Sequence, residues 1–66
     1  MDAKIIGQRL VALRGNRTQD KVSQDTGITR SAYAMYEQGK RIPRDEVKKA
    51  LAKYFNTTIQ ALFFDD

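Results

Sequence analysis

The side chains of this 66-residue chain that could carry chemistry are hydroxyls, carboxylates and cations, because the sequence contains no histidine and no cysteine. Their absence removes the commonest general base, the thiol nucleophile and the commonest zinc ligands. The internal acidic doublet, Asp45-Glu46, stands where a helix is expected to begin, and carboxylates stabilise a helix at that position. We therefore expect no enzymatic activity, no metal site and no cofactor.

The cations are concentrated in the middle of the chain. The formal net charge is +4, and residues 14–44 hold seven lysines and arginines against three acidic residues. An excess of positive charge on so small a body favours an acidic partner. An ordinary solvated surface is the alternative, and charge alone does not decide between the two.

Length and composition predict one soluble domain over residues 1–66. A chain of this length cannot support two hydrophobic cores, and 41% hydrophobic with 30% charged residues is typical of a folded protein. No stretch approaches the roughly 18 apolar residues that a membrane span requires, and the N-terminus lacks the pattern of a signal peptide. We expect a cytoplasmic protein with no membrane partner.

Apolar residues recur at helical spacing, and strand-like alternation is missing from the sequence. Thr18, Thr29 and Thr58 are expected to cap helix N-termini. Pro43 suits the start of the fourth helix, and Gly7 is expected to weaken the first one slightly. The sequence therefore predicts an all-α fold, a compact bundle of five short helices over residues 3–14, 19–26, 30–38 and 43–55 and after residue 58.

Residues 18–39 hold the pattern of a tight helix-turn-helix unit. Such a unit needs a small residue where its helices cross, here Ser23, and a residue without a Cβ four positions later, here Gly27. Apolar residues must lock the crossing, and four stand in register, namely Val22, Ile28, Tyr33 and Tyr36. Each requirement is easily met by chance, but together they make a strong prediction.

These residues closely resemble the Xre family of bacterial and phage regulators, which share the lambda-repressor-like DNA-binding domain. The resemblance covers residues 4–64. The matching residues are Thr18-Gln19, Ser23, Gly27 to Ser31, Tyr36-Glu37, Gly39 to Arg41, Pro43, Leu51 to Lys53, Asn56 and Ile59 to Phe63. The loop at 15–17 is shorter than the common form, and Ser23 replaces the more usual alanine; both departures are compatible with the fold.

The resemblance implies that residues 30–38 lie in the major groove of DNA, with their N-terminal end toward the bases. Arg30 can bind guanine O6 and N7 bidentately, which is worth about 1–3 kcal/mol of discrimination, and Ser31 can donate or accept a hydrogen bond. Ala34 and Met35 lie one turn further on and suit thymine methyl groups. We expect these four residues to contact bases, with packing or a dimer contact as the alternative for Met35.

Six polar residues around this helix are expected to contact phosphate. Gln19 resembles the family glutamine that binds phosphate through its side chain and backbone N–H, and a helix N-terminus suits that role. Thr29 begins the next helix in the same way. The adjoining loops add four cations, for each of which a solvated charge is the alternative: Arg17, Lys40, Arg41 and Arg44.

Arg14 and Glu37 are expected to serve structure rather than base recognition. In this family, an arginine that ends the first helix commonly pairs with the glutamate after the third. The resemblance therefore implies an ion pair between Arg14 and Glu37, bidentate in geometry, that holds the two helices together.

The C-terminal element, about residues 54–66, ends in three consecutive large apolar residues that cannot all point inward from a short helix. One interpretation buries Leu62 and Phe63 and leaves Phe64 at a rim. The other makes a symmetric dimer surface, as family members often do. The interface residues expected in that case are Tyr54, Ile59, Leu62, Phe63 and Phe64.

The leading hypothesis is a sequence-specific, double-stranded DNA-binding transcriptional regulator, a repressor that binds an inverted-repeat operator as a homodimer. Occupying a promoter would exclude polymerase without a cofactor, and no small-molecule ligand is expected. The protein would be cytoplasmic, and at the nucleoid when bound to DNA. The alternative is an antitoxin or interaction module that uses the same helical domain to bind a partner protein.

Overall fold

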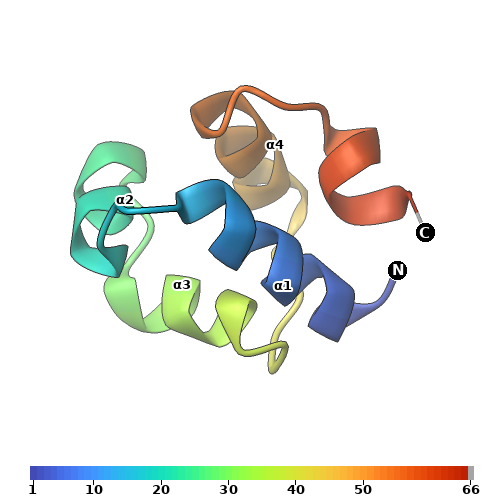
Figure 1. Cartoon of the computed structure of the whole chain (residues 1–66), viewed down its shortest axis with the longest axis horizontal. Coiled ribbons are helices and arrows are strands. Elements are labelled where there is room, and N and C mark those ends of the chain that lie inside the picture. The colour runs from blue at the N-terminus through green and yellow to red at the C-terminus, as the bar shows by residue number, and fades with distance from the viewer. Residues whose placement is uncertain (66) are drawn as a thin grey trace.

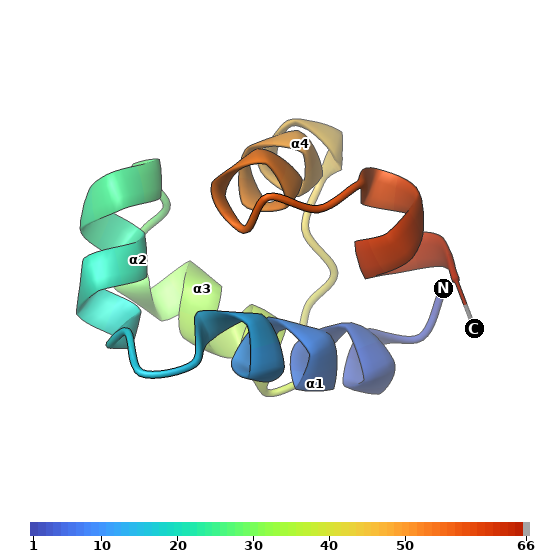
Figure 2. The same ribbon diagram turned by 45° about the horizontal axis from the view of Figure 1, so that its top comes forward.

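Five helices follow one another in the computed structural model, which describes residues 1–65. They are α1 (Ala3–Arg14), α2 (Gln19–Thr26), α3 (Arg30–Glu37), α4 (Asp45–Tyr54) and η1 (Gln60–Phe64). These residues contain no strand, so the predicted all-α fold is confirmed. Figure 2 shows α1 and α3 in a lower layer, α4 and η1 above them, and α2 closing one side.

Helices α1, α2 and α3 begin where hydroxyl or carboxylate side chains accept hydrogen bonds from unpaired backbone N–H groups. Asp2 accepts from the N–H of Lys4 at 2.9 Å, and this cap was not foreseen. Thr18 accepts from the N–H of Lys21 at 3.0 Å, and Thr29 from that of Ala32 at 3.1 Å. The predicted N-caps of α2 and α3 are therefore confirmed.

The prediction that Pro43 starts the fourth helix is wrong. Helix α4 begins at Asp45, after Arg44 in extended conformation, so Pro43 lies two residues before it. The proline side chain is fully buried, which anchors the loop to the core. Asp45 and Glu46 do occupy the first turn, where their charges suit the helix dipole.

Helix η1 is wound as a π-helix, with the N–H of Asp65 bonded to the carbonyl of Gln60 at 2.8 Å. Thr58 caps it by accepting from the N–H of Ala61 at 3.0 Å, as expected. Leu62 and Phe63 are each 1% exposed, whereas Phe64 is 45% exposed. Burial of Leu62 and Phe63 with Phe64 at a rim is as the first interpretation expects, and a dimer surface at Phe64 stays a prediction.

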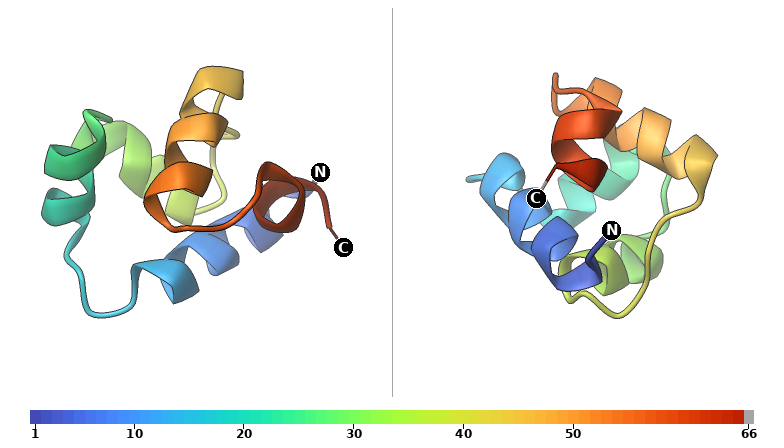
Figure 3. Two further views of the ribbon diagram at one scale, coloured as in Figure 1. Left: turned by 90° about the horizontal axis from the view of Figure 1, so that it is seen from above. Right: turned by 90° about the vertical axis from the view of Figure 1, so that its right-hand side faces the viewer.

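Every one of the five helices contributes side chains to the hydrophobic core. Its buried side chains are Ile6, Leu10, Val22, Tyr33, Tyr36, Leu51, Phe55, Leu62 and Phe63. Helix α1 packs against α3 and η1, while α2 packs against α3 and α4. In every view, the start of α1 and the end of η1 lie side by side (Figures 1, 2 and 3). None of the helices in residues 1–65 is long and apolar enough to cross a membrane.

Two cations hold η1 to the rest of the molecule. Arg9 of α1 donates to the backbone carbonyl of Leu62 at 3.1 Å and to that of Asp65. Lys48 of α4 is buried, and its ammonium lies 5.4 Å from the ring centroid of Phe64 and 6.0 Å from that of Phe63. Sequence reasoning assigned neither residue a role, because such contacts join positions far apart in the chain.

Gly27 ends α2, at the position where the helix-turn-helix pattern requires a residue without a Cβ. A Cβ built at this position meets no atom within 4 Å, so a steric clash is not what requires the glycine. The backbone φ of +77° lies in the left-handed region, which disfavours residues that carry a Cβ. The requirement for glycine is therefore conformational, and a substitution here acts through backbone strain.

Candidate DNA-binding surface

The turn between α2 and α3 satisfies its own polar groups. The hydroxyl of Ser23 donates to the carbonyl of Ile28 at 2.5 Å. Thr26 donates to the carbonyl of Val22 at 2.7 Å and accepts from the N–H of Ile28 at 3.2 Å. These bonds fix the direction in which α3 leaves the turn, because the side chains replace ladder bonds that a turn cannot make.

Helix α3 has a buried face and an exposed one. Tyr33 and Tyr36 point into the core, with 0% and 4% exposure. The other face carries the four residues predicted to contact bases: Arg30 and Ser31 are exposed, Met35 is 38% exposed, and Ala34 is half-buried. Figure 1 shows α3 along one outer edge of the molecule, where a duplex can approach it. The structure thus brings all four onto one accessible surface.

A groove runs between the turn and the start of α4. Thr29, Arg41 and Arg44 line it, together with the buried Tyr36. The guanidinium of Arg41 lies 6.0 Å from the centroid of the Tyr36 ring, so it is held at the C-terminal part of α3. Three of the six residues predicted to contact phosphate are therefore neighbours beside α3.

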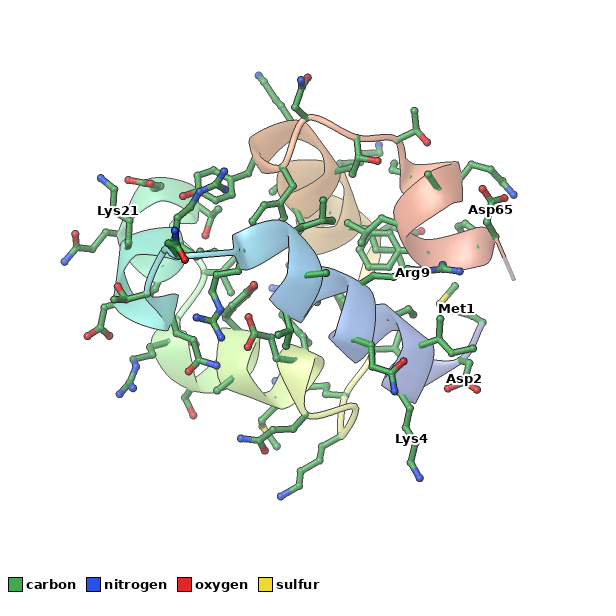
Figure 4. The ribbon with its side chains drawn as sticks, in the orientation of Figure 1. Met1, Asp2, Lys4, Arg9, Lys21 and Asp65 are labelled. Atoms are coloured by element: carbon green, nitrogen blue, oxygen red, sulfur yellow. The ribbon has the colours of Figure 1, made fainter. Side chains whose placement is uncertain are left out.

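Lys40 lies beyond the end of α3, where its N–H bonds to the carbonyl of Met35 at 3.0 Å. The preceding Gly39 lies against α1, since a Cβ built on it would come within 3.1 Å of Cα of Lys4. In Figure 4, the Lys4 side chain extends away from the body on the side of α3. Lys4 is thus a further cation at this edge, which sequence reasoning missed because α1 was not expected to reach it.

The remaining two phosphate candidates are already engaged within the protein. Gln19 donates one amide hydrogen to Glu37 at 2.9 Å, which leaves its second amide hydrogen and its backbone N–H at the start of α2. The guanidinium of Arg17 lies over two rings of α4, at 5.2 Å from Tyr54 and 5.4 Å from Phe55. The structure therefore places Arg17 against α4 rather than beside α3.

Arg14 and Glu37 form the paired arrangement that the resemblance implied. Arg14 Nε donates to Glu37 Oε2 at 2.7 Å and Nη2 donates to Oε1 at 3.0 Å, while Nη1 reaches the carbonyl of Arg17 at 2.9 Å. The Glu37 side chain is only 4% exposed. Burial acts to raise the pKa of Glu37, but the hydrogen bonds from Arg14 and its neighbours outweigh it and hold that pKa below its usual value.

The residues predicted to form a dimer interface do not make one patch. Leu62 and Phe63 belong to the core of the protomer, which corrects the expectation that they present surface to a second copy. The hydroxyl of Tyr54 donates to Asp25 of α2 at 2.7 Å, whereas Phe64 lies over Lys48 in the first half of α4. Ile59 is half-buried, so Phe64 is the most accessible of the five.

A helix-turn-helix whose second helix turns a polar N-terminal end outward, with cations beside it, defines a DNA-binding domain. A family model described as "Helix-turn-helix" matches residues 9–62. The chain therefore belongs to this helix-turn-helix family of Xre and lambda-repressor-like domains, and it is a DNA-binding regulatory protein. Searches of curated proteins and of solved structures found no match to this chain.

Proposed function

We propose that this protein is a sequence-specific transcriptional regulator that represses by occupying an inverted-repeat operator as a homodimer. The observation that carries the proposal is the exposed face of α3, where a guanidinium and a hydroxyl stand beside apolar side chains. Hydrogen-bonding groups and a methyl-sized apolar surface are what direct reading of base edges requires. A bound dimer excludes polymerase from overlapping DNA, and the protein then works in the cytoplasm at the nucleoid.

The cations beside α3 supply affinity without sequence preference. Arg41, Arg44 and Lys40 flank the exposed face, and the backbone N–H of Gln19 lies at the start of α2. Each phosphate contact releases counterions, so log affinity is expected to fall with log salt by about 0.9 per contact. This electrostatic binding positions the protein, and α3 then discriminates among sequences.

Selection of bound sequences from random double-stranded DNA tests the proposal. We expect an inverted repeat whose half-sites lie about one helical turn apart, because two copies of α3 must enter successive major grooves. An ensemble with no enriched sequence would contradict sequence-specific regulation, and a single unrepeated site would contradict the homodimer.

Arg30→Ala is expected to reduce affinity for the selected site by about 5- to 150-fold per half-site, which corresponds to the roughly 1–3 kcal/mol of one bidentate guanine contact. Affinity for random DNA should fall far less. The slope of log affinity against log salt should change by about 0.9 or less, the value for one phosphate contact. The measurement is fluorescence anisotropy on both DNAs across a salt series. Lys21→Ala is the matched control, because Lys21 pairs with Asp25 and its side chain lies away from α3 (Figure 4). Equal losses on both DNAs would show that Arg30 binds phosphate instead.

Phe64→Asp is expected to convert the dimer to monomers in sedimentation. Phe64 is 45% exposed, and the neighbouring N-terminal segment carries Met1 at 52% exposure, so the two termini present apolar surface together. A buried carboxylate would oppose contact between two copies at this end. Val11→Asp introduces the same charge at a side chain of similar exposure in the last turn of α1 and should leave the assembly unchanged. A dimer that survives Phe64→Asp would rule out this surface as the interface.

A further inference from the structure

The helix-turn-helix brings an acid of α2 against the first residue of α3. Oδ1 of Asp20 lies 2.9 Å from Nε of Arg30. Asp20 is the second residue of α2 and Arg30 the first of α3, so the turn between the helices sets their separation. The contact therefore joins the first turn of α2 to Arg30, the residue that the proposed function assigns to guanine binding.

The atom that makes this contact restricts how Arg30 can meet a base. A guanidinium can present two parallel N–H groups either from its two Nη atoms or from Nε and one Nη. Because the carboxylate oxygen of Asp20 lies 2.9 Å from Nε, a guanine acceptor that approached the Nε side would meet this negative charge, so approach to the two Nη groups is favoured. The carboxylate thus favours one of the two bidentate modes, the one that uses both Nη groups.

Stability does not account for the pair. The two side chains are 64% and 67% exposed, and ion pairs that exposed contribute about 0–1 kcal/mol to folding. An acid beside a DNA-reading residue also repels phosphate, which weakens electrostatic binding to any duplex. The carboxylate of Asp20 thus lowers affinity for DNA of any sequence. What it can contribute is the orientation of the Arg30 guanidinium.

We propose that Asp20 is a specificity-determining positioning residue, which aims the Nη fork of Arg30 at guanine and keeps Arg30 from settling on phosphate. The inference rests on the proposed function, because it needs a selected site that contains the guanine. It extends that function by assigning discrimination to a pair of residues on two helices. Asp20 itself then touches no base and acts through Arg30.

The test is a double-mutant cycle of Asp20→Ala and Arg30→Ala, measured by anisotropy on three duplexes. These are the selected site, the same site with its Arg30-contacted guanine replaced by adenine, and random DNA. We expect Asp20→Ala to lower discrimination between the first two by about tenfold, within the range of one base contact, while affinity for random DNA is unchanged or higher. In the Arg30→Ala background, Asp20→Ala should not change discrimination, because no guanidinium remains to be positioned.

Asp25→Ala is the matched control, since it removes the same charge from the same helix, where Asp25 pairs with Lys21 and Tyr54. It should alter binding to all three duplexes alike. Discrimination that is unchanged by Asp20→Ala, or that falls equally with and without Arg30, would overturn the inference and leave Asp20 as a helix-dipole residue. Wild-type protein that selects no sequence would contradict the proposed function itself, which separates the two failures.

Discussion

Gly7→Ala is expected to destabilise the domain by more than about 3 kcal/mol, the upper end of the usual range for overpacking. A Cβ at this position would lie 2.3 Å from the carbonyl oxygen of Glu37 and 2.9 Å from that of Tyr36. Both obstacles are backbone atoms, so no side-chain rotation relieves the clash. Helix α1 would have to move away from the end of α3, whose backbone lies directly against Gly7.

The sign of this effect separates it from ordinary helix propensity. In an exposed helix, replacing glycine by alanine stabilises by about 0.5–1 kcal/mol. Gly7 lies in the middle of α1 and is buried, so propensity alone predicts a gain. A domain of this size is expected to have about 3–10 kcal/mol of stability in all, and the clash therefore threatens folding itself.

Thermal unfolding followed by far-ultraviolet circular dichroism measures the effect. Gln8→Ala is the control, because it introduces the same side chain at the next, exposed position of α1. The control should melt at or slightly above the wild-type temperature, while Gly7→Ala melts far below it or has lost its helicity at 25 °C. A Gly7→Ala protein as stable as the control would show that α1 does not approach α3 at this point.

Gly7 also shows where sequence reasoning ends. The caps of α2 and α3 and the inward face of α3 follow from local patterns, and Thr18, Thr29 and Tyr33 are found where those patterns predict. The need for glycine at position 7 arises from the crossing of two helices whose residues are thirty apart in the chain. No spacing within α1 reports such an approach, so the residue was assigned only a slight weakening effect.

In the candidate site, too, the sequence predicts which residues share one face of a helix but not the contacts between helices. The four base-contact candidates share a face because helical periodicity places them there, which the sequence can express. The positions of Arg17 against α4 and Asp20 against Arg30 depend on how separate helices pack. The same holds for Tyr54, which was expected to join Phe64 in one interface but donates a hydrogen bond to Asp25 of α2. Contacts between elements decide these cases, and one sequence alone contains no record of them.

Arg14→Ala is the second change with a large expected effect, a loss of about 3–5 kcal/mol at pH 7. It removes the guanidinium partner of the Glu37 carboxylate, which is 4% exposed in the wild-type protein, and leaves the hydrogen bond from Gln19. An uncompensated buried charge is much more costly than the ion pair is favourable. The loss should therefore exceed that of any exposed ion pair in the domain.

The pH dependence of this loss tests its cause. In the wild-type protein the pKa of Glu37 is lowered, so its stabilising contribution is present above the unfolded value of 4.5 and is lost as pH falls through the folded pKa. Without Arg14, burial is opposed only by the hydrogen bonds from Tyr33 and Gln19, so the folded pKa of Glu37 should rise relative to the wild-type protein. As pH falls from 7 toward 4.5, protonation of Glu37 then removes the unpaired buried charge from the Arg14→Ala protein. The stability gap, the difference in free energy of unfolding between the wild-type protein and the variant, should therefore narrow.

Urea denaturation at pH 7 and pH 4.5 measures this gap, and a variant unfolded at pH 7 should gain helicity at pH 4.5. In a Glu37→Gln background there is no carboxyl to titrate, so Arg14→Ala should have the same effect at both pH values. A gap that stays constant or widens on acidification would show that Arg14 stabilises the domain through packing or through its bond to the Arg17 carbonyl. If the gap narrows in the wild-type background and not in the Glu37→Gln background, Arg14 stabilises the domain by compensating the charge of Glu37. This ion pair then joins α1 to the end of α3 at the place where Gly7 allows the two helices to meet.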